Sequence, residues 1–143
     1  MKQPFLYSIM TTLSINRSHW ETMLAHLKAV YPLEACGLMA GKNGRVHQIY
    51  PVDNYLASPF AFEMVPQQLV AAMIDIEEQG LTLLAIYHSH PHGPPSPSST
   101  DIAQANYPEA VQVIISLQNQ TQPEAGAFEI TNNRVNIVSL EIV

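Results

Sequence analysis

Residues 87–101 read YHSHPHGPPSPSSTD, with two histidines one residue apart at the start and an aspartate at the end. Side chains of an extended chain alternate between its two sides, so His88 and His90 point the same way and the serine between them points the other way. The ten residues after His90 are rich in proline and serine and predict a stiff loop. The letters SSTD resemble a helix start. We therefore expect Asp101 in the first turn of a short helix, residues 101–106, that folds back over the histidines.

The strand that carries the histidines is predicted to lie at the centre of a sheet. Residues 81–88, LTLLAIYH, are apolar almost without interruption, which is typical of a strand covered on both faces. The helix before it is marked by Pro66 in its first turn and Gly80 just past its end. Three apolar residues at helical spacing predict the buried stripe of this helix: Leu69, Met73 and Ile76. The chain therefore passes from this helix directly into the central strand.

An amphipathic helix is predicted nearer the N-terminus, over residues 18–31. Ser18 and Glu21 stand in the relation of a capping box at its start, and Pro32 is expected to end it. Its apolar face is predicted to contain Trp20, Met23, Leu24, Leu27 and Tyr31. Glu34 follows shortly after this helix, at the point where the next strand begins.

The remaining strands are predicted from turn signals and apolar runs. Residues 36–52 predict a hairpin around Asn43-Gly44, a dipeptide that readily takes the positive φ values of a tight turn. A further strand is expected at residues 111–117, followed by a second hairpin over 127–140 that turns at Asn132-Asn133. Together these elements predict a chain of mixed helices and strands, of the α/β or α+β class.

Composition limits the class of protein. Hydrophobic residues make up 47% and charged residues 13% of the 143 residues, as is typical of one packed globular domain, here residues 1–143. The longest apolar run, residues 83–87, is far too short to cross a membrane, and we expect a soluble, cytoplasmic protein. A net charge of -6 with only six scattered Lys and Arg residues argues against nucleic acid as a partner. A single cysteine, Cys36, rules out a disulfide within the chain.

The histidines and the aspartate have the chemistry of a metal site. Catalytic zinc usually has three protein ligands drawn from His, Asp and Glu, with the fourth position left to water. His88, His90 and Asp101 make up such a set. A hydrolase also needs a base for the water and a hydrogen-bond donor for the oxyanion, and Glu34 and Ser98 are the candidates.

These residues, in this order, resemble the JAMM motif of the MPN metallopeptidase family. The motif consists here of Glu34, the letters HSHP, seven residues from His90 to Ser98 and two more to Asp101. The likeness extends to PLEACGLMAG around the glutamate and to PVDNYLASPFAFEMVPQQL between the first hairpin and the second helix. It covers roughly residues 12–138.

The resemblance implies both a fold and a reaction. The fold is an MPN/JAMM-like, cytidine-deaminase-like curved mixed β-sheet flanked by helices. Zinc is expected on His88, His90 and Asp101, with the zinc-bound water activated by Glu34 and the oxyanion hydrogen-bonded by Ser98. Zinc lowers the pKa of its bound water to about 7 and polarises the scissile carbonyl. The implied reaction is cleavage of an amide or isopeptide bond at the C-terminal tail of a ubiquitin-like or sulfur-carrier protein.

Several side chains have simpler interpretations. Ser98 competes with Ser96 and Ser99 for the donor role and could also serve only as a helix cap. His92 continues the alternation of the first two histidines, but Pro91 and Gly93 flank it and break the strand, so we do not expect it to be a ligand. The cysteine is expected to be a small buried apolar residue. Three further histidines have no partners at ligand spacing and are expected at the surface: His19, His26 and His47.

Other functions compete with the metallopeptidase. A non-catalytic MPN scaffold would mediate assembly only, a deubiquitinase-like isopeptidase would cut ubiquitin chains, and a small-molecule deconjugating enzyme could use the same site. The sequence also leaves a homodimer open. Relatives that process branched chains carry long insertions, whereas here the longest unpatterned stretch beyond the motif is about ten residues, 118–127. We therefore expect a flexible tail as substrate, added as a strand to a sheet edge beside the metal.

Overall fold

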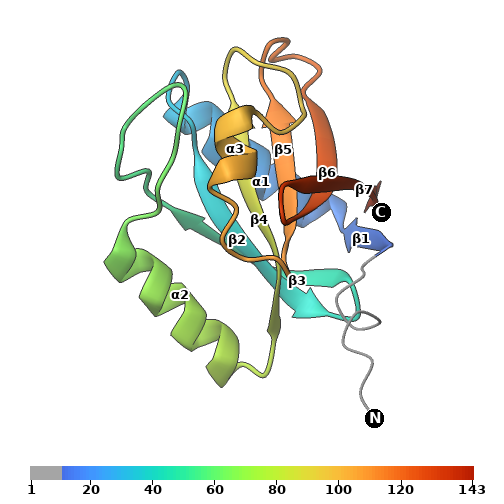
Figure 1. The fold of residues 1–143 in the computed structure, drawn as a ribbon. Coiled ribbons are helices and arrows are strands. Elements are labelled where there is room, and N and C mark those ends of the chain that lie inside the picture. The colour runs from blue at the N-terminus through green and yellow to red at the C-terminus, as the bar shows by residue number, and fades with distance from the viewer. Residues whose placement is uncertain (1–10) are drawn as a thin grey trace.

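The computed structural model describes residues 11–143. Within this range the chain forms seven strands and three helices (Figure 1). In chain order they are β1 (Thr12–Ile15), α1 (Arg17–Val30), β2 (Cys36–Lys42), β3 (Arg45–Val52), α2 (Pro66–Glu78), β4 (Thr82–His90), α3 (Ser99–Ala103), β5 (Val111–Ser116), β6 (Glu124–Thr131) and β7 (Arg134–Ile142).

The sheet is mixed and curves until it closes on itself. Its strand order is β1-β3-β2-β4-β5-β6-β7, and β1 joins the two ends. β1 runs parallel to β7 over four residue pairs and meets β3 only at Ser14 and Arg45. The parallel pair β4–β5 lies at the centre between antiparallel neighbours. The predicted curved mixed sheet is confirmed, while its closure by a strand as short as β1 was not foreseen.

Both predicted hairpins form. The turn between β2 and β3 contains Asn43 at φ 55° and Gly44 at φ 74°, and that between β6 and β7 contains Asn132 at 51° and Asn133 at 63°. Positive φ at both central positions gives a turn whose twist matches that of the flanking strands. Asparagine and glycine tolerate this conformation better than other residues, so these dipeptides predicted the turns correctly.

The first helix begins two residues earlier than the predicted capping box. Asn16 is its N-cap, and Asn16 Oδ1 accepts from the backbone N–H of His19 at 2.7 Å. Asparagine caps as well as serine does, and with Asn16 at the N-cap Ser18 lies inside the helix. The predicted apolar face is confirmed, with Trp20, Met23 and Leu27 buried.

The second helix has the predicted boundaries. It starts at Pro66, ends at Glu78, and is followed by Gly80 at φ 69°. Its buried face differs slightly from the prediction, because Ala72 and Ile76 are the buried residues. Leu69 and Met73 are partly buried and pack against the same apolar cluster. None of the helices in residues 11–143 is long and apolar enough to cross a membrane.

Apolar clusters cover β4 on both faces, as its sequence predicted. In Figure 1, α1 lies behind the sheet, α3 in front of it, and α2 at one side. Ala85 and Tyr87 belong to the cluster that includes the buried face of α1, while Ile86 belongs to the cluster with α2. Because side chains alternate, His88 and His90 follow Ile86 onto the face shared with α2 and α3.

Candidate metal centre

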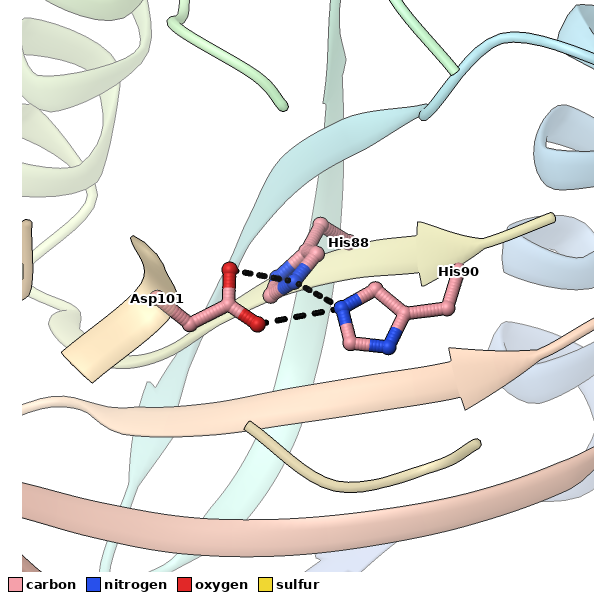
Figure 2. Close-up of side chains that lie close together, drawn as sticks. All are labelled: His88, His90 and Asp101. Atoms are coloured by element: carbon pink, nitrogen blue, oxygen red, sulfur yellow. Dashed lines mark hydrogen bonds and ion pairs between the residues drawn. The ribbon is translucent and has the colours of Figure 1, made fainter. Parts of the chain in front are cut away.

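Three side chains converge where β4 ends. His88 and His90 stand at the end of β4 and point to the same face of the strand, and Asp101 comes from α3 (Figure 2). His88 Nε2 lies 3.2 Å from His90 Nε2 and 3.2 Å from Asp101 Oδ1, and His90 Nε2 lies 3.0 Å from Asp101 Oδ2. Each residue contributes one ligand atom, and these three atoms all lie within 4.8 Å of one another. The predicted ligand set is thus brought together by the fold.

The start of α3 fixes the orientation of Asp101. Ser98 is the N-cap, and Ser98 Oγ accepts from the Asp101 N–H at 3.0 Å. In return, Asp101 Oδ2 accepts from the Ser98 N–H at 2.9 Å, which completes a capping box. The helix itself spans Ser99–Ala103 instead of the predicted 101–106, because the cap lies further upstream. Asp101 nevertheless stands in its first turn, as predicted.

The proline-rich loop orients His90. His90 Nδ1 lies 2.7 Å from the carbonyl oxygen of Pro94, so this nitrogen carries the proton that is donated to the carbonyl. The other nitrogen, Nε2, is then free to bind a metal. His88 is held differently, since its ring stacks on Phe62 at 4.5 Å and 29°. Its Nδ1 is buried without a hydrogen-bond partner among the described residues.

Burial and hydrogen bonding shift the pKa values of the three ligands in different directions. Burial lowers the pKa of His88, which keeps this imidazole neutral. Burial alone would raise the pKa of Asp101, but hydrogen bonds from His88 and His90 hold it well below its usual range. For His90, burial is outweighed by the hydrogen bonds to Asp101 and Pro94, so its pKa is raised. The shifts favour a neutral His88 and an ionised Asp101, as a metal requires, whereas metal binding must displace a proton from protonated His90.

The residues present fit a zinc ion. Two imidazole nitrogens and one carboxylate oxygen are a known donor set for catalytic zinc. Donor atoms about 2.0–2.1 Å from a tetrahedral zinc are separated by about 3.3–3.4 Å. The separations of 3.0–3.2 Å found here are close to this value. Zinc itself is inferred from the chemistry of these donors.

Glu34 lies in the same buried region and does not belong to the ligand cluster. The residue is only 4% exposed, and Oε1 has no hydrogen-bond partner in the part of the chain that the structure describes. Burial raises the pKa of Glu34 to about 7, with a lowering contribution from His90 and a raising one from Asp101. A carboxyl group that titrates near neutral pH is suited to accept and return a proton.

A cavity of about 500 Å³ opens beside the ligands. His88 and Asp101 form part of its wall. Apolar residues of the segment between β3 and α2 line another part, among them Leu56, Phe62 and Met64. Polar residues in or just after α3 and on β5 also line it, among them Thr100, Gln104 and Gln112. A substrate group reaching the ligands has room here between an apolar and a polar wall.

The other candidates lie apart from the cluster. The His92 side chain is exposed and packs against Tyr31 and Phe60, with ring centroids 5.8 and 6.4 Å apart. Cys36 is fully buried, and burial raises the pKa of its thiol to about 12, in keeping with its predicted apolar role.

The three remaining histidines differ from one another. His47 is exposed, as predicted. The prediction was wrong for His26, which is half-buried with Nδ1 2.8 Å from the Tyr87 hydroxyl oxygen, and for His19, which is also half-buried. Both lie on α1 next to residues of its buried face: His19 precedes Trp20, and His26 precedes Leu27.

Sequence reasoning missed the residues that support the site. Phe62 and Asn54 both come from the segment PVDNYLASPFAFEM, which lacks periodic apolar spacing and gave no element prediction. Their contacts are long-range, with His88 and with the Glu34 backbone. An asparagine or aromatic residue in such a segment indicates a supporting role only when the fold shows which distant residue it contacts.

Comparison with known families agrees with this geometry. A family described as prokaryotic homologs of the JAB domain matches residues 16–131. The chain belongs to this family. Its ligand cluster and Glu34 lie within the matched range.

Three curated relatives share part of the chain. A probable TtuB-protein conjugate cleaving protease from Thermus thermophilus is 42% identical over 66% of this chain and 64% of its own length. A desampylase from Haloferax volcanii is 39% identical over 59% of this chain and 63% of its own length. The chain thus spans less than two thirds of both. A CysO-cysteine peptidase from Mycobacterium tuberculosis is 28% identical over 85% of this chain and 84% of its own.

Solved structures share the fold. The solution structure of protein DSY2949 from Desulfitobacterium hafniense has a TM-score of 0.83 and 32% identity, covering 92% of both chains. AF2198, a JAB1/MPN domain protein from Archaeoglobus fulgidus, has a TM-score of 0.56 and 18% identity, covering 92% of this chain and 96% of its own. The second likeness concerns the fold alone.

Proposed function

We propose that this protein is a zinc-dependent hydrolase that cleaves an amide or isopeptide bond at the C-terminal tail of a ubiquitin-like or sulfur-carrier protein. The observation that carries the proposal is the convergence of His88, His90 and Asp101 beside a cavity, with the buried carboxyl of Glu34 in electrostatic interaction with His90 and Asp101. The names of the three relatives support it, since each describes a cleaving protease, a desampylase or a peptidase.

The roles of the side chains follow from their protonation and position. When bound by His88, His90 and Asp101, zinc supplies a Lewis acid that acidifies water and polarises a carbonyl group. Glu34 takes a proton from the attacking water and returns it to the leaving nitrogen, a task suited to its pKa of about 7. The stacked ring of Phe62 excludes water from one side of His88.

Ser98 is proposed as the donor to the oxyanion. Its Oγ already accepts the N–H of Asp101, but the hydroxyl hydrogen is not used in that bond. The side chain is exposed and one turn from a ligand, so it can donate to a substrate oxygen while capping the helix. The cap and donor roles are therefore compatible in one residue.

The approach of the substrate differs from the sequence-based expectation. β4 is paired with β2 on one side and with β5 on the other, so the strand that carries the two histidines has no free edge. Strand addition beside the metal is therefore ruled out on β4. We propose instead that the tail enters the 500 Å³ cavity, where its backbone can meet polar side chains such as Gln112.

A short tail remains the preferred substrate over a ubiquitin chain. The connection between β5 and β6 comprises only residues 117–123, because β6 begins at Glu124, earlier than predicted. This leaves little surface for gripping a second folded protein. The retained ligand set argues against the scaffold alternative. A cytoplasmic location, in keeping with the single buried cysteine, and a homodimer stay predictions.

A competition assay tests the proposal. The zinc-loaded protein is offered a carrier protein with a C-terminal adduct and linked diubiquitin at equal concentration, and products are identified by mass spectrometry. We expect faster release of the adduct. Faster hydrolysis of diubiquitin would reassign the substrate to the isopeptidase alternative. Absence of turnover for both, and for small-molecule amides, would favour the scaffold.

A further inference from the structure

The segment that joins β3 to α2 is held closed by the side chain of Asn54. Asn54 Nδ2 donates to the carbonyl oxygens of Glu34 and Ala61, both at 3.0 Å. Asn54 Oδ1 accepts from the backbone N–H groups of Leu56 and Glu63, at 3.0 and 3.1 Å. The half-buried amide thus uses two donor hydrogens and two acceptor lone pairs, its full hydrogen-bonding capacity.

Both backbone polar groups of Glu34 are tied to this segment. Its carbonyl accepts from Asn54, and its N–H donates to the carbonyl of Ser58 at 2.9 Å. The next residue, Ala35, is held from the other side, because its N–H donates to Ser89 Oγ on β4 at 2.9 Å. The main chain at Glu34 is therefore fixed between a central strand and a loop.

The side chain of Glu34 has little else to aim it. Oε1 is buried without a hydrogen-bond partner among residues 11–143. The direction of the carboxyl group therefore depends largely on the placement of its own backbone. A shift of about 1 Å in a catalytic group is enough to lower a rate by about 10²-fold.

The same loop also supports a metal ligand. Phe62 stacks on the imidazole of His88 and stands between Ala61 and Glu63, both of which are hydrogen-bonded to Asn54. One amide side chain thus sets the position of the Glu34 backbone and of the aromatic wall against His88.

We propose that Asn54 is a positioning residue that holds Glu34 in register with the metal ligands. It acts through the Glu34 carbonyl and the loop, without touching the reacting atoms. The inference rests on the proposed hydrolase function, since it assigns Asn54 a part in aligning the base of that reaction. Its structural half, the tether on Glu34, is measurable without any turnover.

The substitution Asn54→Asp removes the amide's donor group and keeps its acceptor oxygen. The carboxylate can still accept from Leu56 and Glu63, but it loses both donors and places an oxygen against the Glu34 carbonyl. We expect about 10²-fold lower kcat with KM nearly unchanged and with zinc content as in the wild type. Amide exchange followed by NMR should be faster at Glu34 while Leu56 and Glu63 stay protected.

The matched control is Gln68→Ala. Gln68 also ties the loop, by exchanging hydrogen bonds with Asp53 at 2.7 and 2.8 Å, but it has no bond to Glu34. We expect kcat and the exchange rate at Glu34 to stay at wild-type values in this variant. Asn54→Ala serves as a second probe and should lower kcat at least as much as Asn54→Asp.

The outcomes are distinguishable. Wild-type kcat in Asn54→Asp and in Asn54→Ala would overturn the positioning role, and so would an equal loss in Gln68→Ala, which would indicate general loosening of the loop. If the wild-type protein itself cleaves nothing, the proposed function fails, and amide exchange alone then decides. Faster exchange at Glu34 in Asn54→Asp but not in Gln68→Ala supports the tether, whereas unchanged exchange overturns it.

Discussion

The two faces of β4 carry out different tasks with neighbouring residues. Toward α1, Tyr87 is fully buried within the larger apolar cluster. Toward α2 and α3, His88 and His90 are only 1% and 7% exposed, yet both contact Asp101, and His88 also lines a cavity. Alternation along the strand thus separates packing from chemistry by a single residue.

The difference between the faces lies in how buried polar groups are satisfied. On the α1 face, the Tyr87 hydroxyl is hydrogen-bonded to His26 Nδ1 at 2.8 Å. On the other face, His88, His90 and Asp101 satisfy one another, and Glu34 Oε1 and His88 Nδ1 have no partner among the described residues. Unpaired buried polar atoms are costly. Among the described residues a third such atom, His19 Nδ1, lies on α1, so two of the three belong to the ligand site. Substitutions on the two faces should therefore have separable effects.

The largest expected effect comes from His88→Ala. Removing a ligand removes the metal's stabilisation of the transition state, several kcal/mol, so turnover should fall by about 10³-fold or more. The adjacent change Tyr87→Phe should leave turnover intact and lower the free energy of unfolding by about 1 kcal/mol, through loss of one hydrogen bond. Kinetic assays and urea denaturation of both variants measure this contrast. Equal losses of turnover would show that the faces are not separate.

Glu34→Gln should have the next largest effect. The amide cannot accept a proton, so kcat should fall by about 10²- to 10⁴-fold, the range for general acid–base groups. The ligands are untouched, and zinc content should remain that of the wild type. Steady-state kinetics and metal analysis on the same sample check both statements. Wild-type rates in this variant would remove Glu34 from the mechanism.

Ser98→Ala tests whether Ser98, at the start of α3, donates the hydrogen bond to the oxyanion. We expect kcat to fall by about 10²- to 10³-fold, as for one oxyanion donor, and stability to fall by about 1 kcal/mol through loss of the cap. Ser98→Thr keeps both the hydroxyl and the cap and should restore most of the rate. Ser96→Ala is the matched control at an exposed serine of the same loop. A loss in the control and none in Ser98→Ala would transfer the donor role to Ser96.

The smallest expected effect is a pH dependence on the α1 face. Burial lowers the pKa of half-buried His26, against a raising contribution from Asp53. Below about pH 6.5 His26 is protonated in the unfolded chain, whereas in the folded protein it stays neutral to lower pH. The free energy of unfolding should therefore be highest near pH 7 and decrease as the pH falls. Because His26 is partly exposed, the slope should stay below about 1.4 kcal/mol per pH unit. Urea denaturation at pH 7 and pH 5 should show a flatter profile for His26→Gln, and parallel profiles would contradict this assignment.

Local signals in the sequence predicted the ligand side of the molecule well. Period-two alternation placed His88 and His90 on one side, and the SSTD start placed Asp101 in a helical first turn, both as found. These relations depend on neighbouring residues, so the chain alone determines them. The hairpin turns at Asn43-Gly44 and Asn132-Asn133 were predictable for the same reason.

Features that depend on distant contacts were not predictable. The four residues of β1 close the sheet only because β7 and β3 lie on either side of them. The pairing of β4 with β2 and β5 likewise joins distant segments, and it leaves the histidine-bearing strand without a free edge for strand addition. The tether from Asn54 to Glu34 spans 20 positions and comes from a segment without periodicity.

The central claim, that one face of β4 builds a zinc site, is tested most directly by native mass spectrometry of the purified protein. We predict about one zinc per chain for the wild type, as for three-ligand catalytic sites. The double variant His88→Ala with His90→Ala should contain none, while Tyr87→Phe should keep the wild-type stoichiometry. Full zinc stoichiometry in the double variant would contradict the claim, because the metal would then be held by residues other than those that converge here.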